Sequence, residues 1–199
     1  MNHTLYKTLL VLLLAATALT SCEKCANVTI TEPTPEDSEW LVYKQNDTVS
    51  FQTEADDVVR YTRTGIYAQN VPGEGFSLED ECIDQVDVQV RTVMEDITNA
   101  QPYLGTRILS KPNDLVVELA VGENVDDKAV VELGVWEIDE NSPAYDSMEV
   151  NDRMYYEVFE VNPEITAANS ISQLLFNKEF GFLRVAFNSG KKLERLPAP

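Results

Sequence analysis

From Glu39 onward, apolar and polar residues alternate with a period of two, which is the pattern of β-strands that bury one face. The clearest run covers residues 86–94, where valines and a methionine alternate with mostly polar side chains. Polar segments rich in Asn, Asp, Gly or Pro separate such runs and predict turns. Further strands are expected at residues 40–43, 48–51, 58–67, 115–119, 129–136, 147–150, 155–161, 172–176, 180–187 and 192–196.

Two stretches depart from this alternation. Residues 165–171 predict a short helical segment, and the chain around Pro102 and Pro112 predicts a loop. A count of about nine to eleven strands, without a long amphipathic helix, predicts a mainly β fold with little helix. We expect a curved antiparallel sheet that forms a half-open barrel or a sandwich.

The N-terminus carries a different pattern, an apolar run at residues 9–18 that follows the basic residue Lys7. At about ten residues, this run is too short to cross a bilayer core of about 30 Å. The next four residues, 19–22, read Leu-Thr-Ser-Cys, which is the signature that a bacterial lipoprotein peptidase cuts. We therefore predict that residues 1–21 are a signal peptide and that the mature chain begins at a lipidated Cys22.

This signature predicts an outer-membrane lipoprotein of the cell envelope, facing either the periplasm or the outside. Acyl chains on Cys22 would hold the protein in the membrane, because each buried methylene contributes about 0.8 kcal/mol. Residues 23–26 lack the acidic run that often accompanies surface export, so the sequence does not choose between the two faces. Two alternatives stay open: an ordinary secretory signal that leaves Cys22 as a thiol, and a buried apolar helix.

The predicted mature chain divides into a tether and one domain. Residues 22–38 include prolines 33 and 35 among acidic residues, which indicates an extended tether. Residues 39–199 have a length that suits a single β domain with a substantial core.

The chain has three cysteines, Cys22, Cys25 and Cys82. If lipid occupies the first, the other two form an even pair in an oxidising compartment, which favours a Cys25–Cys82 disulfide. The alternative is two unpaired thiols. A zinc site is not expected, because the single histidine, His3, lies within the predicted signal peptide.

The chain is strongly acidic, with 34 Asp and Glu against 15 Lys and Arg and a formal net charge of −19. Nucleic acid is therefore not expected as a partner, since phosphate backbones are bound mainly through Lys and Arg. The same charge would keep the domain away from anionic lipid surfaces. The membrane contact that we expect is made through the lipid on Cys22.

The C-terminal part resembles envelope lipoproteins of Bacteroides-type bacteria. The resemblance lies in a Tyr-x-x-Val-x-x-Val strand that begins at Tyr155, a Gly-x-x-Arg strand from Gly181 to Arg184, and an Asn-Gly-Lys-like turn at residues 188–191. Here Ser189 is inserted in that turn. The resemblance implies a twisted antiparallel sheet wrapped toward a half-barrel, similar to lipoprotein carriers of the periplasm, and most such proteins have no assigned activity.

Motifs for catalysis are missing from the sequence, which has no Gly-x-Ser-x-Gly, glycine-rich phosphate loop or EF-hand calcium loop. We expect no enzyme activity, no cofactor and no metal, but a binding or interaction module for an amphiphile, a glycan or a protein partner. On a curved sheet, Trp136, Tyr156 and Phe182 could line a ligand pocket and Arg184 could bind an anion. The alternatives are packed core for the aromatic residues and an ion pair for Arg184.

More specific functions would each require a further feature. An amphiphile carrier requires an apolar cavity on the concave face, and a surface accessory protein for glycans or other nutrients requires display outside the cell. A glycoside hydrolase with two carboxylates is hard to support, because acid pairs are abundant in so acidic a chain. Calcium at Asp126 and Asp127, or at residues 139–141, would raise the melting temperature, and we expect no such rise.

Overall fold

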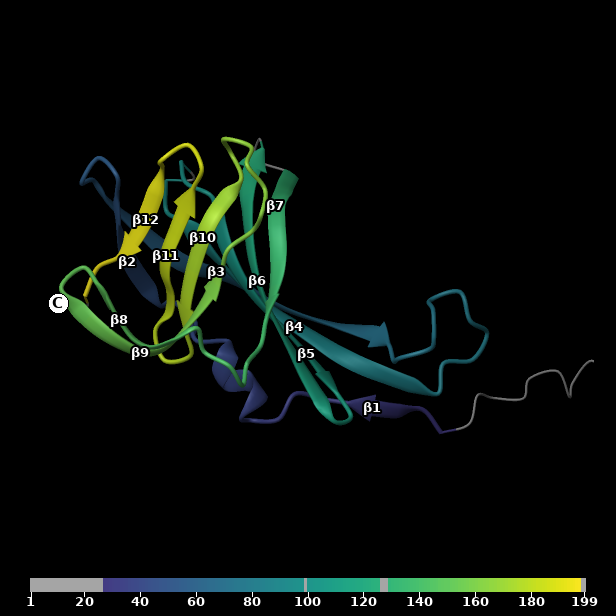
Figure 1. The fold of residues 1–199 in the computed structure, drawn as a ribbon. Helices are drawn as coiled ribbons and strands as arrows, with labels where there is room; N and C mark the ends of the chain where they lie inside the picture. Colours follow the sequence, from purple (N-terminus) through teal and green to yellow (C-terminus); the bar gives the residue numbers. More distant parts are fainter. Residues whose placement is uncertain (1–26, 99, 126–128, 198–199) are drawn as a thin grey trace, which may run out of the picture.

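The computed structural model describes residues 27–98, 100–125 and 129–197, and this part of the chain is nearly all β (Figure 1). Its strands form one 12-stranded sheet that curls strongly into a largely antiparallel half-barrel. The expectation of a mainly β fold with a curved antiparallel sheet is confirmed. The elements are β1 (Thr29–Thr31), η1 (Asp37–Trp40), β2 (Thr48–Thr53), β3 (Val58–Pro72), β4 (Gln85–Asp96), β5 (Tyr103–Lys111), β6 (Asp114–Val125), β7 (Ala129–Ile138), β8 (Tyr145–Val150), β9 (Arg153–Val161), β10 (Ile171–Asn177), β11 (Gly181–Phe187) and β12 (Lys192–Arg195).

The sheet consists of two meanders in the order β7-β6-β5-β4-β3-β2-β12-β11-β10-β9-β8. Within each meander, consecutive strands are neighbours. The two meanders are joined where β12 pairs with β2, with Leu193 opposite Thr53 and Arg195 opposite Phe51. The short strand β1 lies off this path and pairs with β4 in parallel.

The concave face of the half-barrel holds the main hydrophobic core. Alternate residues of most strands point inward, so that each strand contributes apolar side chains to a shared interior. Aromatic rings meet edge to face there, at 5.2 Å between Phe51 and Tyr61 and 5.3 Å between Phe176 and Phe182. The largest buried members are Phe51, Tyr61, Met94, Leu104, Ile108, Leu119, Phe176 and Phe182.

The 3-10 helix η1 packs its last residue, Trp40, into one end of the half-barrel. The ring of Trp40 lies 5.0 Å from Phe159 and 6.3 Å from Phe176. The prediction of a strand at residues 40–43 is wrong, because a reciprocal cap starts a helical turn just before it. The Thr34 N–H donates to Asp37 Oδ2 (2.9 Å), and the Asp37 N–H donates to Thr34 Oγ1 (3.1 Å).

A second, smaller core lies on the outer face of β9, β10 and β11. It consists of Val150, Tyr155, Val158, Leu175 and Leu183. The β8–β9 hairpin reaches this face because β9 bends at Glu157, whose φ is +52°. The Asn177 side chain holds the bend, since its Nδ2 donates to the Tyr156 carbonyl at 2.6 Å.

The outer parts of β3 and β4 project from the half-barrel as a long hairpin (Figure 1). We call residues 63–72 and 85–93 the β3–β4 arm and the connecting residues 73–84 the tip loop. Strand β1 runs along the arm, with Ile30 opposite Val86. Residues 66–70 on β3 are exposed, so the arm contributes little to the main core.

The structure differs from the sequence predictions at three further places. Strand β5 occupies Tyr103–Lys111, where a loop was expected. Residues 165–171 contain no helix, and their carbonyls are held by Asn188, whose Nδ2 donates to the Ile165 carbonyl at 2.6 Å. Regular structure begins at β1, within the segment that was expected to be a tether, because residues 29–31 pair with β4.

Candidate functional site

The interior of the half-barrel is filled by its own side chains. Phe182, which the sequence suggested as a ligand-facing residue, has no exposed surface and packs edge-on against Phe176. It therefore belongs to the core, which was the alternative interpretation. A carrier that holds an amphiphile on the concave face would need space that Phe51, Tyr61 and Phe176 already occupy.

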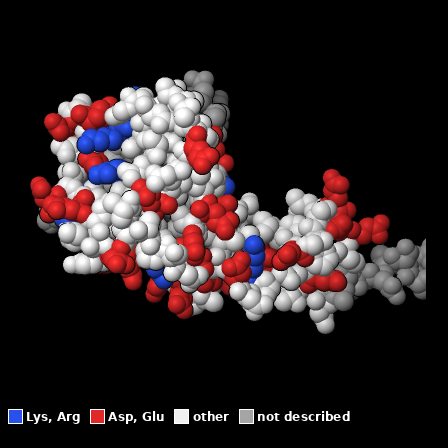
Figure 2. Space-filling view, in the orientation of Figure 1, with Lys and Arg blue, Asp and Glu red and all other residues white. Residues whose placement is uncertain are grey.

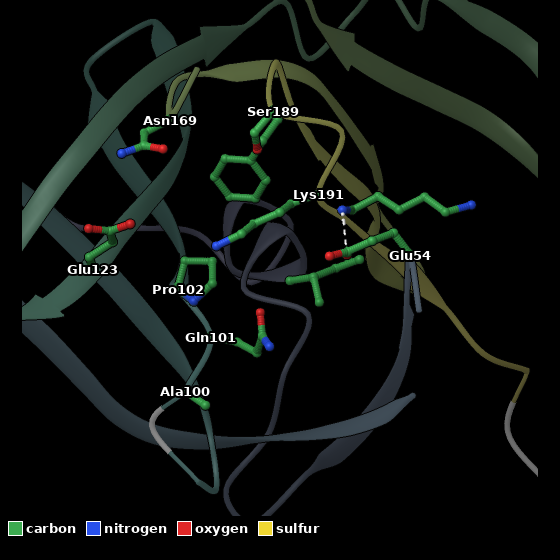
Figure 3. A pocket seen from close by; sticks show the side chains of 11 residues that line it. Glu54, Ala100, Gln101, Pro102, Glu123, Asn169, Ser189 and Lys191 are labelled. Atoms are coloured by element: carbon green, nitrogen blue, oxygen red, sulfur yellow. Dashed lines mark hydrogen bonds between the residues drawn. The ribbon is translucent and has the colours of Figure 1, made fainter. Parts of the chain in front are cut away.

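The end of the half-barrel remote from Trp40 opens into a small polar mouth (Figure 3). Its volume is about 160 Å³, below the range of roughly 300–1,000 Å³ that is typical of ligand pockets. The Lys192 N–H donates to Glu54 Oε2 at 3.2 Å. Hydrogen bonds from its own N–H and from that of Lys192 hold the pKa of the exposed Glu54 below its usual value. Residues lining the mouth include Gln101, Pro102, Glu123, Asn169, Ser189 and Lys191.

Trp136 and Arg184 also have partners within the protein. Trp136 is half-buried against the main core, and its ring lies over Gly134, where an added Cβ atom would collide with it. Arg184 pairs with Glu194 of the neighbouring strand β12, at 2.6 Å from Nη2 and 2.7 Å from Nε to Oε1. The ion-pair interpretation of Arg184 thus describes what the structure shows.

A surface groove of about 660 Å³, which we call the Tyr156 groove, lies at one end of strand β9. Of the four residues suggested as ligand-facing, only Tyr156 lines it. Tyr156 is 69% exposed and the nearby Met154 is 47% exposed. One wall is η1 with the residues around it, the second is the start of β9, and the floor is the β10–β11 turn. The lining residues are Pro35, Ser38, Glu39, Leu41, Val42, Lys44, Met154, Tyr155, Tyr156, Glu157, Asn177, Lys178, Glu179 and Phe180.

The floor of the groove is rigid because Asn177 is fully engaged. Its Oδ1 accepts hydrogen bonds from the N–H groups of Glu179 and Phe180, both at 2.9 Å. Its Nδ2 donates to the carbonyl of Tyr156, which fixes the floor to the wall. A preformed site loses less entropy on binding than a mobile one.

Charged groups of both signs lie along the groove. Lys178 Nζ lies 3.1 Å from Glu39 Oε2 and 5.3 Å from the centre of the Trp40 ring. This pair bridges the floor and the η1 wall. Leu41, Val42 and Met154 supply apolar surface between these charges. The groove therefore combines an apolar strip with a polar rim, as interaction sites commonly do.

A second groove of about 290 Å³ lies on the outer face of β3, β4, β5 and β7. The Arg91 guanidinium lies 4.9 Å from the centre of the Tyr67 ring. Arg107, directly opposite Arg91, pairs with Glu118 at 3.9 Å and with Glu132. The two carboxylates offset the two guanidinium charges, so this groove has no net positive charge to attract an anion.

The predicted lipid and disulfide sites lie at the limit of the described chain. Cys22 and Cys25 fall outside the described residues, whereas Cys82 is in the tip loop and is disulfide-bonded. None of the helical segments that the structure describes is long and apolar enough to span a bilayer.

Calcium ligands are not assembled in the part of the chain that the structure describes. No group of three His, Cys, Asp or Glu side chains there could hold a metal ion. Asp139 Oδ1 accepts a hydrogen bond from the Asn141 N–H at 3.1 Å, so this carboxylate caps its own turn. Asp126 and Asp127 lie outside the described residues.

No protein-family model, curated protein sequence or solved structure matches this chain. The grooves and the sequence signature at Cys22 are therefore the features of this chain that bear on its function.

Sequence reasoning found Tyr156 but not the rest of its groove. Leu41 and Val42 come from a different part of the chain than Met154, and only the fold brings them together. The one local signal was the pair of large apolar residues, Met154 and Tyr156, at alternate positions of a strand whose opposite face is buried.

Proposed function

We propose that the protein is a lipid-anchored, non-catalytic binding module of the bacterial cell envelope, held at the outer membrane through Cys22. The lipoprotein signature at residues 19–22 supports the anchor. The Tyr156 groove supports the binding role, because it is a cavity of about 660 Å³ that exposes the aromatic Tyr156 and the thioether of Met154. In this proposal the surface, and not the packed interior, binds the partner.

The composition of the groove favours an extended segment of a partner protein as the ligand. Methionine and tyrosine are enriched at protein interfaces, since they provide large contact areas that adapt to a partner. Met154 and Tyr156 lie beside Leu41 and Val42 in the strip, with Lys178 at the rim. The arrangement suits a chain with apolar side chains flanked by polar ones.

A glycan is the second candidate ligand, and the exposed Tyr156 is the observation that supports it. An exposed tyrosine ring can stack on the face of a sugar, and Glu39, Glu157 and Glu179 along the groove can accept hydrogen bonds from hydroxyl groups. If a glycan is the ligand, we propose that the protein is a surface accessory protein that binds glycans or other nutrients.

Photo-crosslinking in intact cells tests the binding role. A benzophenone amino acid replaces Tyr156 in one variant and Val58, which is 60% exposed on β3 outside the groove, in a matched control. We expect a discrete crosslinked product from position 156 that is absent from position 58 and is lost when Met154→Asp is added. Equal crosslinking at both positions, or none at 156, would contradict the groove as the binding site.

The chemical class of the product separates the two candidates. A protein partner gives a product that a protease degrades and whose peptides can be identified by mass spectrometry. A glycan partner gives a product that retains sugar after protease treatment. Hydrolysis of bound glycans by the purified protein would contradict the non-catalytic part of the proposal.

The lipid anchor is tested separately by intact mass. The protein purified from envelope membranes should begin at Cys22 and carry acyl chains, and the Cys22→Ser variant should lack them. A full-length or unacylated mature chain in the membrane fraction would contradict the anchor and leave the crosslinking result unaffected.

A further inference from the structure

The β3–β4 arm and the β8–β9 hairpin lie at opposite ends of the molecule (Figure 1). The arm strands contain about ten residues each, which at about 3.3 Å per residue corresponds to roughly 30 Å. The Tyr156 groove lies at the β9 end, with Met154 and Tyr156 in its wall. The tip loop and the groove are therefore separated by the arm and the half-barrel.

The described chain begins at the outer end of the arm. The Thr29 N–H donates to the Asp84 carbonyl at 2.8 Å, and Thr29 pairs with Gln85 at the base of the tip loop. Because β1 and β4 are parallel, β1 runs from the tip loop toward the half-barrel. Asn27, the first described residue, thus lies at the tip-loop end.

Cys22 precedes Asn27 by only five residues. A fully extended chain spans at most about 3.6 Å per residue, so five steps reach at most about 18 Å. A lipid on Cys22 would therefore keep the outer end of the arm within about 18 Å of the bilayer. A Cys25–Cys82 disulfide, as the cysteine count predicts, would shorten this link further, because Cys82 belongs to the tip loop.

Leu78 is the most exposed apolar side chain of the tip loop. Leu78 is 82% exposed, the largest exposed fraction among the large apolar side chains described. The loop turns around it, since the Ser77 N–H donates to Asp80 Oδ2 at 2.6 Å and the Asp80 N–H donates to the Ser77 carbonyl at 3.2 Å. Such a turn can place Leu78 in the headgroup region of a bilayer.

Acidic residues of the tip loop and the half-barrel determine which lipid surface the protein can approach and in which orientation. Glu74, Glu79 and Asp80 beside Leu78 are repelled by anionic headgroups, so the loop suits a zwitterionic surface. Acidic side chains are also scattered over the half-barrel and the arm on the face in Figure 2, where they outnumber basic ones. Laying the half-barrel on the membrane would dehydrate those carboxylates without burying comparable apolar surface.

We propose that the tip loop contacts the bilayer surface at the anchor and that the arm holds the half-barrel roughly 30 Å from it. The Tyr156 groove then lies at the end of the molecule remote from the membrane. This inference rests on lipidation of Cys22, which belongs to the proposed function.

Depth-dependent fluorescence quenching tests this orientation with the acylated full-length mature protein. A fluorescent amino acid replaces Glu79 in the tip loop or Ser189 in the β11–β12 turn, both exposed turn residues. Each protein is reconstituted in vesicles of phosphatidylcholine and phosphatidylethanolamine with brominated acyl chains. We expect a loss of fluorescence at position 79 and none at 189. The loss at 79 should become smaller when Leu78→Ser is added.

Three outcomes overturn the proposal in distinguishable ways. Equal quenching at positions 79 and 189, or stronger quenching at 189, contradicts the orientation while the lipid anchor stands. Unchanged quenching at 79 in the Leu78→Ser variant contradicts the contact through Leu78. An intact mass without acyl chains contradicts the anchor and the orientation together. The Cys22→Ser protein serves as a control and should show no quenching at either position.

Discussion

The hydroxyl of Tyr43 accepts a hydrogen bond of 2.8 Å from the backbone N–H of Phe182, which lies 139 positions further along the chain. Both residues are buried. The bond fixes the segment after η1 to the start of β11, next to Gly181. It links the wall of the Tyr156 groove to the main core, because Leu41 and Val42 directly precede Tyr43.

Replacing Tyr43 with Phe should destabilise the protein by about 1–3 kcal/mol, because the buried Phe182 N–H loses its acceptor. Chemical denaturation would measure this change in the free energy of unfolding. The matched control is Tyr156→Phe, which removes an exposed hydroxyl and should change the free energy of unfolding by less than about 0.5 kcal/mol. A Tyr43→Phe variant as stable as the wild type would contradict the role of this bond.

Alkaline pH should destabilise the wild type more than the Tyr43→Phe variant. Burial raises the pKa of Tyr43 to about 12, so the folded state keeps a proton that the unfolded state loses above about pH 10. Stability therefore falls as pH rises between these values. Between about pH 9 and about pH 11, the wild type should lose about 1 kcal/mol more than the variant. Denaturation curves at both pH values test this, and equal losses would contradict it.

Gly181→Ala should cost more stability than Gly190→Ala. Both glycines have a positive φ, +79° and +89°, which a side chain tolerates at a cost of about 1–2 kcal/mol. A Cβ on Gly181 would also collide with the Tyr43 hydroxyl, whereas open space surrounds Gly190. The difference in unfolding free energy between the two variants measures the cost of the collision between the added Cβ and the Tyr43 hydroxyl. Similar losses in both would show that backbone conformation alone matters.

Acidic pH should remove the contribution that Glu194 makes to the free energy of unfolding. Burial opposes its charge, but hydrogen bonds and ion pairs with Lys192 and Arg184 are stronger and lower its pKa below 4.5. Its contribution is therefore present above about pH 4.5 and is lost as pH falls through the folded-state pKa.

The Glu194→Gln variant tests this pH dependence. At neutral pH it should be less stable than the wild type by about 1 kcal/mol, since Glu194 is partly exposed to solvent. The difference should narrow as the pH falls below about 4 in urea denaturation. The exposed Glu149→Gln is the control and should show little difference at any pH. A gap that stays constant with pH would contradict the prediction.

The Cys25–Cys82 pairing can be tested by peptide mapping without reduction. A peptide containing residue 25 should be linked to the one containing Cys82. The variant Cys82→Ser should lower the free energy of unfolding by about 2–4 kcal/mol, because the crosslink restricts the unfolded chain. A link between residues 22 and 82 would contradict both this pairing and lipidation of Cys22.

Period-two alternation was enough to predict most of the sheet, and it failed where burial was not one-sided. On β5, Tyr103 and Gly105 face outward yet are buried like their inward neighbours, so the first four residues of the strand show no alternation of burial. At Trp40, the local cap between Thr34 and Asp37 favoured a helical turn over the strand that the apolar run suggested. For Arg184, the structure shows the ion pair with a neighbouring strand that was one of its two interpretations, and Glu194 on β12 is the partner.

The candidate site was less accessible to sequence reasoning. Tyr156 could be singled out as an aromatic residue on a strand, but its exposure depends on the bend at Glu157. That bend depends in turn on Asn177, in a different hairpin. A groove whose walls come from distant segments has no local signature in the sequence.

The position of β12 has a consequence for how the chain becomes folded. Its four residues, Lys192–Arg195, make the only strand pairing described between the two meanders, yet they follow every other strand in chain order. The N-terminal meander can form without them, but the two half-sheets are joined only once β12 has paired with β2. Deleting residues 192–195 should therefore leave two unjoined half-sheets exposed to proteolysis.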